Sequence, residues 1–341
     1  MLEIRDRLDY LFVSRRHKIV GVLVSFCLFF ILLFNNFTFF AVFFLLLPLW
    51  LLWRAVSNRL HRLVSLLWIA WTTQAPKCHS NEALAALGLT VRQMDDIQNQ
   101  GKTEVVLAEW GAENRILSHV GPIPVLGEVV LHSRGFQLRA KNQTQLVWLE
   151  GALVLKKRYL LLERFINEVL ALHALRHESG FPRLYRVVPE RKILYREFIL
   201  AEDLGRKMAQ KGFLEGDQER TQFIFLGADR NGQKITPRPG DEILREQALQ
   251  TLRLCVEEPF LQQAAQLLHT IHRQGLAYRD LKYGNLLIHN GAPMIVDFDI
   301  ARRYPRHSPL FAEAVRHDWC CFQHLFAIAP AHSEVEKGCD A

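Results

Sequence analysis

The sequence lacks the cysteine and glycine patterns that identify several common kinds of site. Its six cysteines include no C-x-x-C pair and no zinc-like alternation with histidine, which excludes the usual zinc and dithiol redox motifs. No G-x-G-x-x-G run is present, which excludes a glycine-rich phosphate-binding loop of the ordinary kind. The chain also has no internal repeats and no low-complexity tracts, which excludes solenoid architectures.

The basic excess of the chain gathers beside its most apolar part. The 341 residues carry a net charge of +7, and much of it stands on the two sides of the apolar segment between residues 19 and 53. Attraction to anionic lipid explains charges in that position, and no RNA- or DNA-binding signature accompanies them. We therefore expect a lipid bilayer, and not nucleic acid, as a partner. The flanking basic residues are Arg5, Arg7, Arg15, Arg16, His17, Lys18, Arg54, Arg59 and Arg62.

Two uncharged apolar runs, 19–34 and 37–53, are separated only by Asn35 and Asn36. One helix through both runs would be about 50 Å long, well beyond the roughly 30 Å hydrocarbon core of a bilayer. We therefore predict a two-span transmembrane hairpin, with both ends in the cytoplasm because basic residues flank it on both sides. Each run is short for a span, so a re-entrant hairpin in one leaflet stays an alternative. A cleaved signal peptide is disfavoured, since the apolar block is too long and no small-x-small cleavage site follows it.

Residues 63–71 read Leu-Val-Ser-Leu-Leu-Trp-Ile-Ala-Trp. This pattern predicts an interfacial helix with Trp68 and Trp71 at the level of the lipid headgroups, although a buried helix of the globular part would have the same pattern. Residues 1–75 are thus predicted to be a membrane anchor, and residues 76–127 a juxtamembrane linker of unknown role.

An α+β arrangement is predicted beyond the linker. Short strand-like runs, the first and last of them rich in Val and Leu, predict strands at 128–132, 137–140, 146–149 and 152–156, and apolar spacing of three and four residues predicts a helix over 160–176. A strand pair at 184–188 and 192–198 follows. Two helices are then expected at 242–256 and 259–274, with a strand at 286–288. The pattern indicates a small β-rich part over 128–200 and a mainly helical part over 201–341.

The strongest motif covers residues 278–285, Tyr-Arg-Asp-Leu-Lys-Tyr-Gly-Asn, between a helix that ends at a glycine and a strand. Twelve residues after its Asn285 comes Asp297-Phe298-Asp299, behind an apolar run. The first motif resembles the H-R-D-L-K-x-x-N catalytic loop of protein kinases, and the second resembles their D-F-G motif with the glycine replaced. The order, spacing and strand context of the two motifs make the resemblance specific, and it covers about residues 128–326.

The resemblance implies a two-lobed protein-kinase-like fold that uses ATP and Mg²⁺. In such a fold Asp280 is the catalytic base, and Lys282 places a positive charge near the γ-phosphate. Asn285 and Asp297 are the implied magnesium ligands, because Mg²⁺ prefers a few protein oxygens together with phosphate oxygens and water.

The family also requires a strand lysine paired with a helix glutamate. The run Ala-Leu-Val-Leu-Lys at 152–156 resembles the V-A-I-K motif, and Glu168 lies twelve residues beyond Lys156. Alternation along the strand places Val154 and Lys156 on one face and sends the neighbouring Lys157 to the other. We therefore predict that Lys156 pairs with Glu168 and contacts the ATP phosphates. A solvated surface lysine is the alternative for Lys156 taken alone.

Three weaker matches complete the implied site. The backbone groups of Glu197, Phe198 and Ile199 lie where the family bonds the adenine edge. Asp318 lies where the family has a buried helix aspartate that braces the catalytic loop, although an aspartate near a helix start is also a common N-cap. Only Gly135 lies at a suitable distance to cover phosphates, and an ordinary turn glycine explains it equally well.

The implied activity is that of a membrane-anchored, ATP-dependent kinase with its catalytic domain on the cytoplasmic side of an inner or plasma membrane. A Ser/Thr-type protein kinase is favoured by the Tyr-Arg-Asp-Leu-Lys loop. A glycolipid kinase, similar to bacterial kinases of lipopolysaccharide core sugars, is favoured by the short segment between Asp297 and Asp318, by Asp299 and by the hairpin. A pseudokinase scaffold is the third alternative, supported only by the missing glycine loop. The acceptor is accordingly expected to be a protein or a glycolipid.

Overall fold

The computed structural model describes residues 38–73, 81–110, 116–127, 143–226, 236 and 238–328. The chain divides into two units, residues 1–65 with 226–236 and residues 66–225 with 237–341. All predicted site residues fall within the range of the second unit. One of them, Gly135, lies outside the described residues. The description that follows α3 therefore concerns the second unit.

Helix α3 (Thr38–Thr72) covers two segments that were predicted separately. The second predicted span, 37–53, and the predicted interfacial helix, 63–71, fall within this one helix apart from Phe37, while the first span, 19–34, lies outside the described residues. Within the part of the chain that the structure describes, no helix is long and apolar enough to cross a membrane. The transmembrane hairpin is therefore not confirmed.

The last turns of α3 have one buried and one exposed face. Leu66 and Ile69 are buried in a core cluster that also contains Phe165. Trp68 and Trp71 on the same turns are exposed. A buried helix and an interfacial helix were alternatives for this segment, and the structure shows that its buried face belongs to the globular core.

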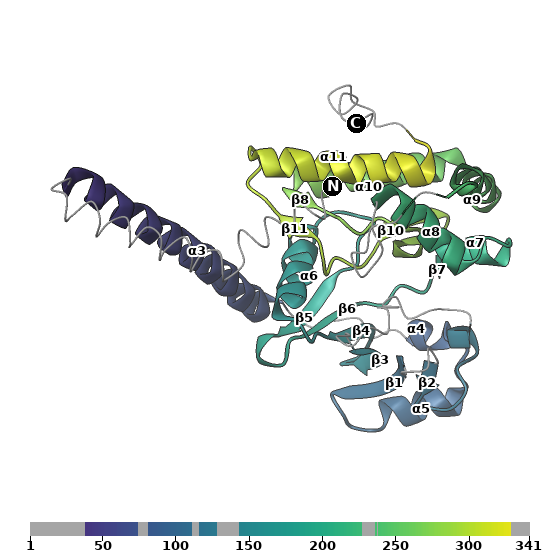
Figure 1. The fold of residues 1–341 in the computed structure, drawn as a ribbon. Helices are drawn as coiled ribbons and strands as arrows, with labels where there is room; N and C mark the ends of the chain where they lie inside the picture. Colours follow the sequence, from purple (N-terminus) through teal and green to yellow (C-terminus); the bar gives the residue numbers. More distant parts are fainter. Residues whose placement is uncertain are drawn as a thin grey trace. The chain divides into compact units, whose positions relative to one another are not determined.

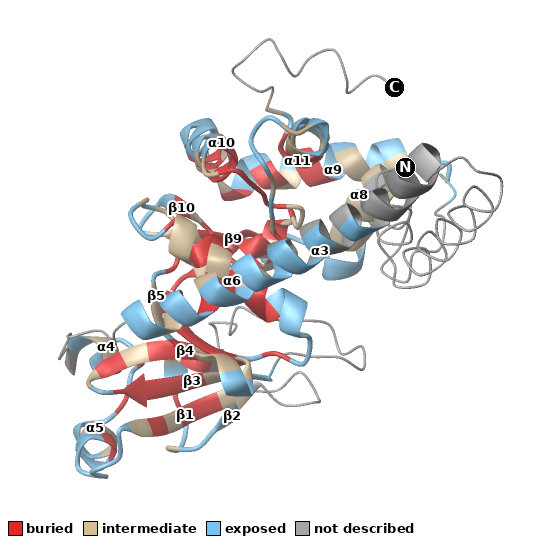
Figure 2. Cartoon of the chain, turned by 90° about the vertical axis from the view of Figure 1, so that its left-hand side faces the viewer, coloured by how far each residue is buried: buried red, intermediate tan, exposed pale blue. Residues whose placement is uncertain are grey.

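The β-rich lobe is built on a six-stranded sheet in the order β2-β1-β3-β4-β6-β5, with antiparallel pairing throughout (Figure 1). Buried residues run along β3 and β4 at its centre (Figure 2). The predicted strands near 146–149, 152–156, 184–188 and 192–198 are confirmed. The strands are β1 (Glu104–Trp110), β2 (Ile116–Ser118), β3 (Gln143–Leu149), β4 (Ala152–Arg158), β5 (Leu184–Val188) and β6 (Ile193–Glu197), with the 3-10 turn η2 (Pro189–Arg191) between the last two.

This sheet begins earlier in the chain than the sequence predicted. Strand β1 pairs with β3, and a core cluster joins Leu84 and Leu107 to Leu146 and Leu155. The helices α4 (Asn81–Ala85) and α5 (Val91–Gln98) and the 3-10 turn η1 (Pro124–Gly127) belong to the same region. Much of the segment predicted to be a linker is therefore part of the β-rich lobe. The predicted strands 128–132 and 137–140 lie outside the described residues.

Helix α6 (Leu162–Ala174) confirms the helix predicted over 160–176, and it packs against the β5–β6 end of the sheet. Its apolar residues Phe165 and Val169 share a buried cluster with Val187 of β5 and Leu194 of β6. Glu168 lies on this helix and is 0 % exposed. A charged side chain at such a position needs a buried partner of opposite charge.

The helical lobe surrounds one large apolar core, to which Leu204, Leu252, Leu268 and Phe322 contribute. The helices predicted at 242–256 and 259–274 are confirmed, and the two-lobed α+β architecture is confirmed for the second unit. The helices of this lobe are α7 (Leu204–Gln210), α8 (Glu215–Leu226), α9 (Asp241–Cys255), α10 (Glu258–Arg273) and α11 (Pro309–Phe326). Its short strands and turn are β7 (Glu202–Asp203), β8 (Leu276–Ala277), η3 (Tyr283–Asn285), β9 (Leu286–His289), β10 (Ala292–Ile295) and β11 (Arg302–Arg303).

Candidate active site

The loop after β8 is held by a buried carboxylate of α11. The backbone N–H groups of Tyr278 and Arg279 donate to the two carboxylate oxygens of Asp318, at 2.7 and 2.9 Å. Asp318 is 1 % exposed, and His272 Nε2 lies 3.0 Å from the same carboxylate. Arg279 has a φ of 68°, in the left-handed region that a non-glycine residue adopts only where its surroundings enforce it. The prediction that Asp318 braces this loop is confirmed.

The braced loop presents Asp280 between two polar side chains. Lys282 Nζ lies 2.6 Å from Asp280 Oδ2, and Asn285 Nδ2 donates to the same oxygen at 2.8 Å and to the Asp280 carbonyl at 2.9 Å. Burial by itself would lower the pKa of the Lys282 ammonium, but the carboxylates of Asp280 and Asp297 outweigh burial and raise that pKa. Lys282 is therefore a cation beside the predicted base.

The segment after β10 is anchored by an aromatic side chain. Phe298 is 0 % exposed and packs edge to face on Phe181 and Tyr278, with ring centroids 6.0 and 5.3 Å apart. Asp297 has a φ of 66°, which turns the chain sharply just before this phenylalanine. The anchor and the turn together present the carboxylates of Asp297 and Asp299 at one place.

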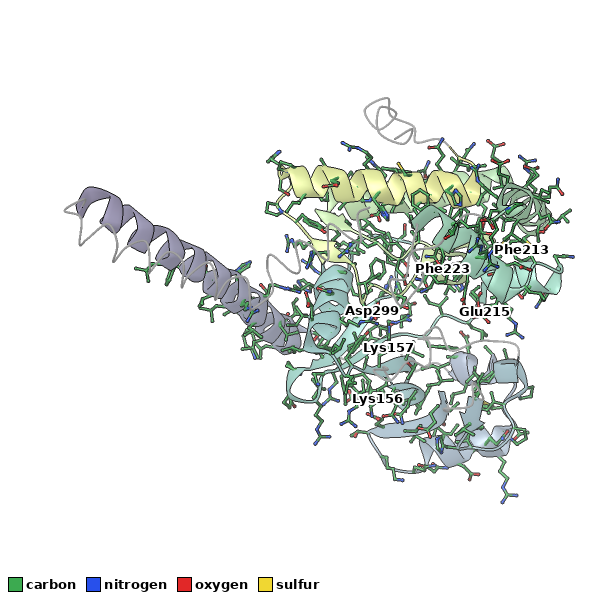
Figure 3. All side chains as sticks on the ribbon, viewed as in Figure 1. Lys156, Lys157, Phe213, Glu215, Phe223 and Asp299 are labelled. Carbon is green, nitrogen blue, oxygen red and sulfur yellow. The ribbon has the colours of Figure 1, made fainter. Side chains whose placement is uncertain are left out.

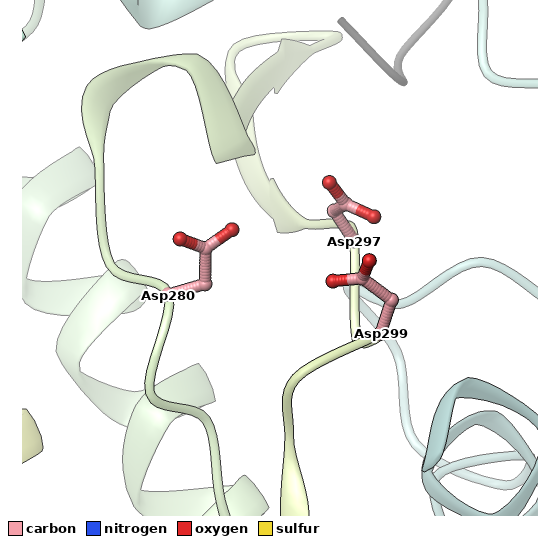
Figure 4. Close-up of side chains that lie close together, drawn as sticks. All are labelled: Asp280, Asp297 and Asp299. Carbon is pink, nitrogen blue, oxygen red and sulfur yellow. The ribbon is translucent and has the colours of Figure 1, made fainter. Parts of the chain in front are cut away.

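The carboxylates of Asp280, Asp297 and Asp299 form one cluster. One oxygen from each of Asp280, Asp297 and Asp299 lies within 4.8 Å of the others (Figure 4). Burial would raise the pKa of Asp297, but the ammonium groups of Lys157 and Lys282 lower it to about 2. Burial and the nearby Asp297 charge raise the pKa of Asp299 to about 7. The cluster therefore concentrates negative charge. Asp299 ionises less readily than Asp297, because its pKa is raised while that of Asp297 is lowered.

The donor set of this cluster fits a magnesium ion. Carboxylate and amide oxygens are the ligands that Mg²⁺ takes from proteins, usually one or two carboxylates with phosphate oxygens and water. Asp297 and Asn285, the predicted ligands, both border the cluster, since Asn285 bonds the Asp280 carboxylate. Asp299 offers a carboxylate at the same place, which the sequence reasoning did not include among the ligands.

Lys157, and not Lys156, is the buried lysine of the site (Figure 3). Its Nζ lies 2.7 Å from Glu168 Oε2 and 2.8 Å from Asp297 Oδ1, and its side chain is 0 % exposed. Burial would lower the pKa of the Lys157 ammonium, but Asp297 and Glu168 outweigh burial and raise that pKa. The predicted pairing of Lys156 with Glu168 is therefore wrong, and the rejected neighbour makes that pair.

Lys156 lies on the opposite face of β4. Its ammonium pairs with Glu104 of β1, whose other carboxylate oxygen accepts a hydrogen bond from the Tyr195 hydroxyl at 2.7 Å. The prediction failed because both faces of this strand are covered by apolar clusters, one containing Val154 and the other Leu155. Alternation separates the two lysines correctly, but it does not reveal which face looks toward α6.

Glu168 has further partners deep in the lobe. The Tyr159 hydroxyl donates to Glu168 Oε2, and the Arg196 Nε lies 3.6 Å from Glu168 Oε1. Both partner side chains are almost completely buried. Burial and the nearby Glu168 charge raise the pKa of Tyr159 well above its ordinary value, so the hydroxyl keeps the proton that it donates. The glutamate is thus held from three sides.

The segment after β6 connects the two lobes where an adenine edge was predicted to bind. The Glu197 N–H donates to the Arg183 carbonyl at 2.8 Å, so this N–H is already engaged. The Glu197 carbonyl accepts a hydrogen bond from Arg196 Nη1 at 3.4 Å, so the backbone groups of Phe198 and Ile199 are the better candidates for contact with a base. Buried apolar side chains lie next to Ile199, as an apolar ring would require. They are Ala201, Leu287 and Val296.

Several site residues were missed by the sequence reasoning. Strand alternation places Lys157 on the face opposite Lys156, but nothing in the local sequence shows which of the two faces belongs to the site. Asp299 was noted only as a replaced glycine, although its carboxyl beside Asp297 was a signal for a third acidic group. Tyr159 and Arg196 gave no local signal, because their contacts with Glu168 depend on the packing of three separate elements.

Chemically, the site brings one buried ammonium group, a carboxylate cluster and a braced aspartate into one place.

Residues 242–323 of the chain match the family model of the protein kinase domain. The matched region runs from α9 into α11 and includes Asp280, Asn285 and Asp297, whereas Lys157 and Glu168 lie before it. No curated protein matches the chain.

Proposed function

We propose that this chain, of which residues 242–323 match the protein kinase domain, transfers the γ-phosphoryl group of Mg²⁺–ATP to a hydroxyl group of an acceptor. One observation carries this proposal. Lys157 Nζ lies between Glu168 and Asp297, and Asp280 shares the carboxylate cluster of Asp297. Transfer of a phosphoryl group needs a positioned cation, metal-binding oxygens and a carboxylate for the attacking hydroxyl, and these are the groups brought together here.

Each residue has a role that follows from its surroundings. Lys157, fixed by Glu168, would present its ammonium to the phosphates of ATP. Asp297 and Asn285 would hold a magnesium ion, which would supply positive charge against the phosphates. Asp280 orients the acceptor hydroxyl and accepts its proton, and Lys282 stabilises the charge that develops on the transferred group. Of the three residues predicted to bond the adenine edge, Phe198 and Ile199 would do so through their backbone groups, because those of Glu197 are already engaged. Gly135, the candidate for covering phosphates, lies outside the described residues and stays a prediction.

A protein serine or threonine is the acceptor that we propose first. The supporting observation is the contact of Lys282 Nζ with Asp280 Oδ2 at 2.6 Å, because the Asp-Leu-Lys order is the feature of the loop that is similar to Ser/Thr protein kinases. A lysine beside the base can neutralise the phosphoryl group during transfer.

A glycolipid or sugar hydroxyl is the second candidate acceptor. It is favoured by the short segment between Asp297 and α11, which begins at Pro309. Asp299 in the glycine position supports the same alternative.

We also propose that the protein is attached to a membrane with its catalytic unit in the cytoplasm. The apolar runs at 19–34 and 37–53 with basic flanks support attachment, as do the exposed Trp68 and Trp71 on α3. Extraction of membranes at high pH, and a reporter fused after Ala341, test these two statements separately. Release of the protein by the extraction contradicts attachment, and reporter activity outside the cytoplasm contradicts the orientation.

The reaction is tested by incubating the purified full chain with γ-labelled ATP, Mg²⁺ and a membrane fraction. Label in protein bands supports the first acceptor, and label in the extracted lipid supports the second. Asp280→Asn is the matched control, which must lose the label in either fraction. If the wild type labels neither fraction and shows no Mg²⁺-dependent ATP binding, the proposed transfer is refuted and the scaffold alternative gains support.

A further inference from the structure

The segment Asp297–Asp299 is joined to α6 at two levels. The first level is the Lys157 bridge, which connects Glu168 with Asp297 at 2.7 and 2.8 Å. The second level lies one helical turn earlier, where Arg164 Nη1 is 3.1 Å from Asp299 Oδ2. Residues four apart share one face of a helix, so Arg164 and Glu168 face the segment together.

The second level has its own backbone contact. The Asn167 side-chain amide donates to the carbonyl oxygen of Asp299 at 3.1 Å. The Asp299 side chain is 8 % exposed, while that of Arg164 is 45 % exposed, so the guanidinium reaches from the surface of α6 toward a buried carboxylate. The helix therefore contacts both the side chain and the backbone of this one residue.

The ion pair exists only because an aspartate follows Phe298. The D-F-G motif that this segment resembles ends in glycine, which has no side chain to meet a guanidinium. Glycine also leaves the backbone free to rotate, whereas an aspartate held by two side chains of α6 is restricted. The replacement thus adds a connection between the metal-binding segment and the helix that carries Glu168.

We propose that Arg164 and Asp299 are positioning residues whose ion pair holds α6 against the metal-binding segment, so that Glu168 stays on Lys157. The inference rests on the proposed phosphotransfer function and adds how its site is kept assembled. The inference assigns a structural role to Asp299, which stands where the D-F-G motif has glycine.

A different role for Asp299 would be that of a third metal ligand, because its carboxylate lies in the cluster with Asp280 and Asp297. Arg164 separates the two roles. It is a cation that ligates no metal, so removing it leaves all three carboxylates in place while it removes the proposed ion pair. A metal-ligand role predicts an effect of changing Asp299 only, and the positioning role predicts equal and coupled effects of changing either residue.

The test compares Arg164→Ala, Asp299→Asn and the double variant in the full-length protein at about pH 8, where the Asp299 carboxyl is ionised. Amide hydrogen exchange of residues 162–174 reports on α6, and the kcat and KM for ATP at saturating Mg²⁺ report on the site. We expect each single variant to speed exchange in α6 and to lower kcat by roughly 2- to 10-fold, the range of one partly exposed charge-assisted hydrogen bond. The double variant should be no worse than the single variants, since both remove the same contact.

Two control variants sharpen this experiment. Arg164→Lys keeps a cation at the same place and should recover most of the rate. Arg176→Ala, just beyond the end of α6, removes an exposed arginine whose Nη1 donates to the nearby His173 carbonyl at 2.7 Å, and it should change neither exchange nor rate.

Additive losses in the double variant would overturn the proposal, and so would unchanged exchange in Arg164→Ala. A raised Mg²⁺ requirement in Asp299→Asn without any effect of Arg164→Ala would assign Asp299 to the metal instead. Hydrogen exchange does not depend on phosphoryl transfer. A wild type that transfers no phosphoryl group but shows the coupled exchange effects would therefore refute the proposed function and retain the ion pair's role in holding α6.

Discussion

Replacing Lys157 by methionine should abolish most phosphoryl transfer, whereas the same replacement of Lys156 should leave transfer nearly unchanged. The Lys157 side chain is 0 % exposed and bridges Glu168 and Asp297. The Lys156 side chain is 19 % exposed and pairs with Glu104 on the other face of β4. Methionine keeps an apolar stem and removes the charge, so the two neighbouring lysines form a matched pair of test and control.

The stability cost can be worked from the contacts. Without Lys157, Glu168 is a buried charge that has lost its nearest cation, and breaking a buried ion pair in this way costs about 3–5 kcal/mol. Tyr159 and Arg196 still contact the glutamate, which favours the lower end, about 3 kcal/mol. For a domain of this size that corresponds to a fall in Tm of roughly 6–12 °C. The Lys156 pair is nearer the surface, where the cost is about 0–1 kcal/mol.

The effect on function is expected to exceed the effect on folding. Removing one preorganised charged group from an active site commonly costs about 10²–10³ in rate, and we expect a loss of this size in kcat/KM for ATP. Transfer of label from ATP measures the loss, and thermal unfolding measures stability. Adding Glu168→Gln to Lys157→Met removes the orphaned charge, so stability should partly recover while transfer does not.

Full transfer by Lys157→Met would refute this reasoning. Loss of transfer in a folded Lys156→Met protein would refute it equally, because it would show that the lysine on the other face contacts the nucleotide. Recovery of transfer in the double variant would show that the lysine served only to neutralise Glu168.

Three further predictions concern other parts of the second unit. Asp280→Asn should lower kcat by about 10²–10⁴ with nearly unchanged Mg²⁺–ATP affinity, whereas Asp297→Asn should also weaken binding, as titration with a fluorescent ATP analogue measures. The pKa of Asp299 rises from 3.8 to about 7 on folding, so the folded chain holds a proton that the unfolded chain has released, and stability falls as pH rises through that window. Asp299→Asn should remove this part of the decline in Tm of metal-free protein between pH 4.5 and 7. Leu66→Ala should cost about 2–5 kcal/mol in urea unfolding because the side chain is buried, while Leu67→Ala, 61 % exposed, should cost about 0.5 kcal/mol or less.

Each of these predictions has an outcome that contradicts it. Wild-type nucleotide binding by both aspartate variants would remove the distinction between base and metal ligand. An unchanged pH dependence in Asp299→Asn would show that its carboxyl ionises normally in the folded chain. Equal costs for the two leucine variants would show that α3 does not pack on α6, and a deletion of residues 1–72 would then be as stable as a deletion of residues 1–62.

Local sequence determined the parts of the site that are contiguous in the chain. The loop with Asp280 and Asn285 and the segment with Asp297 each carry their motif within a few residues, and helix and strand patterns around them were regular enough to place α6, α9 and α10. Their relative geometry follows from a short path through β9 and β10, which pair as neighbours. Such features depend on short-range backbone preferences and could be predicted.

Only the tertiary structure decided the contacts that join distant segments. An alternating strand pattern separates Lys156 from Lys157, but both faces of β4 are apolar. Lys157 pairs with Glu168 because α6 packs on the side of the sheet that Lys157 faces. Strand β1 belongs to the sheet because it pairs with β3. Arg164 contacts Asp299, which lies 135 residues further along the chain. A periodic sequence specifies that two faces differ, whereas the identity of the face that meets a distant helix depends on how the whole core packs.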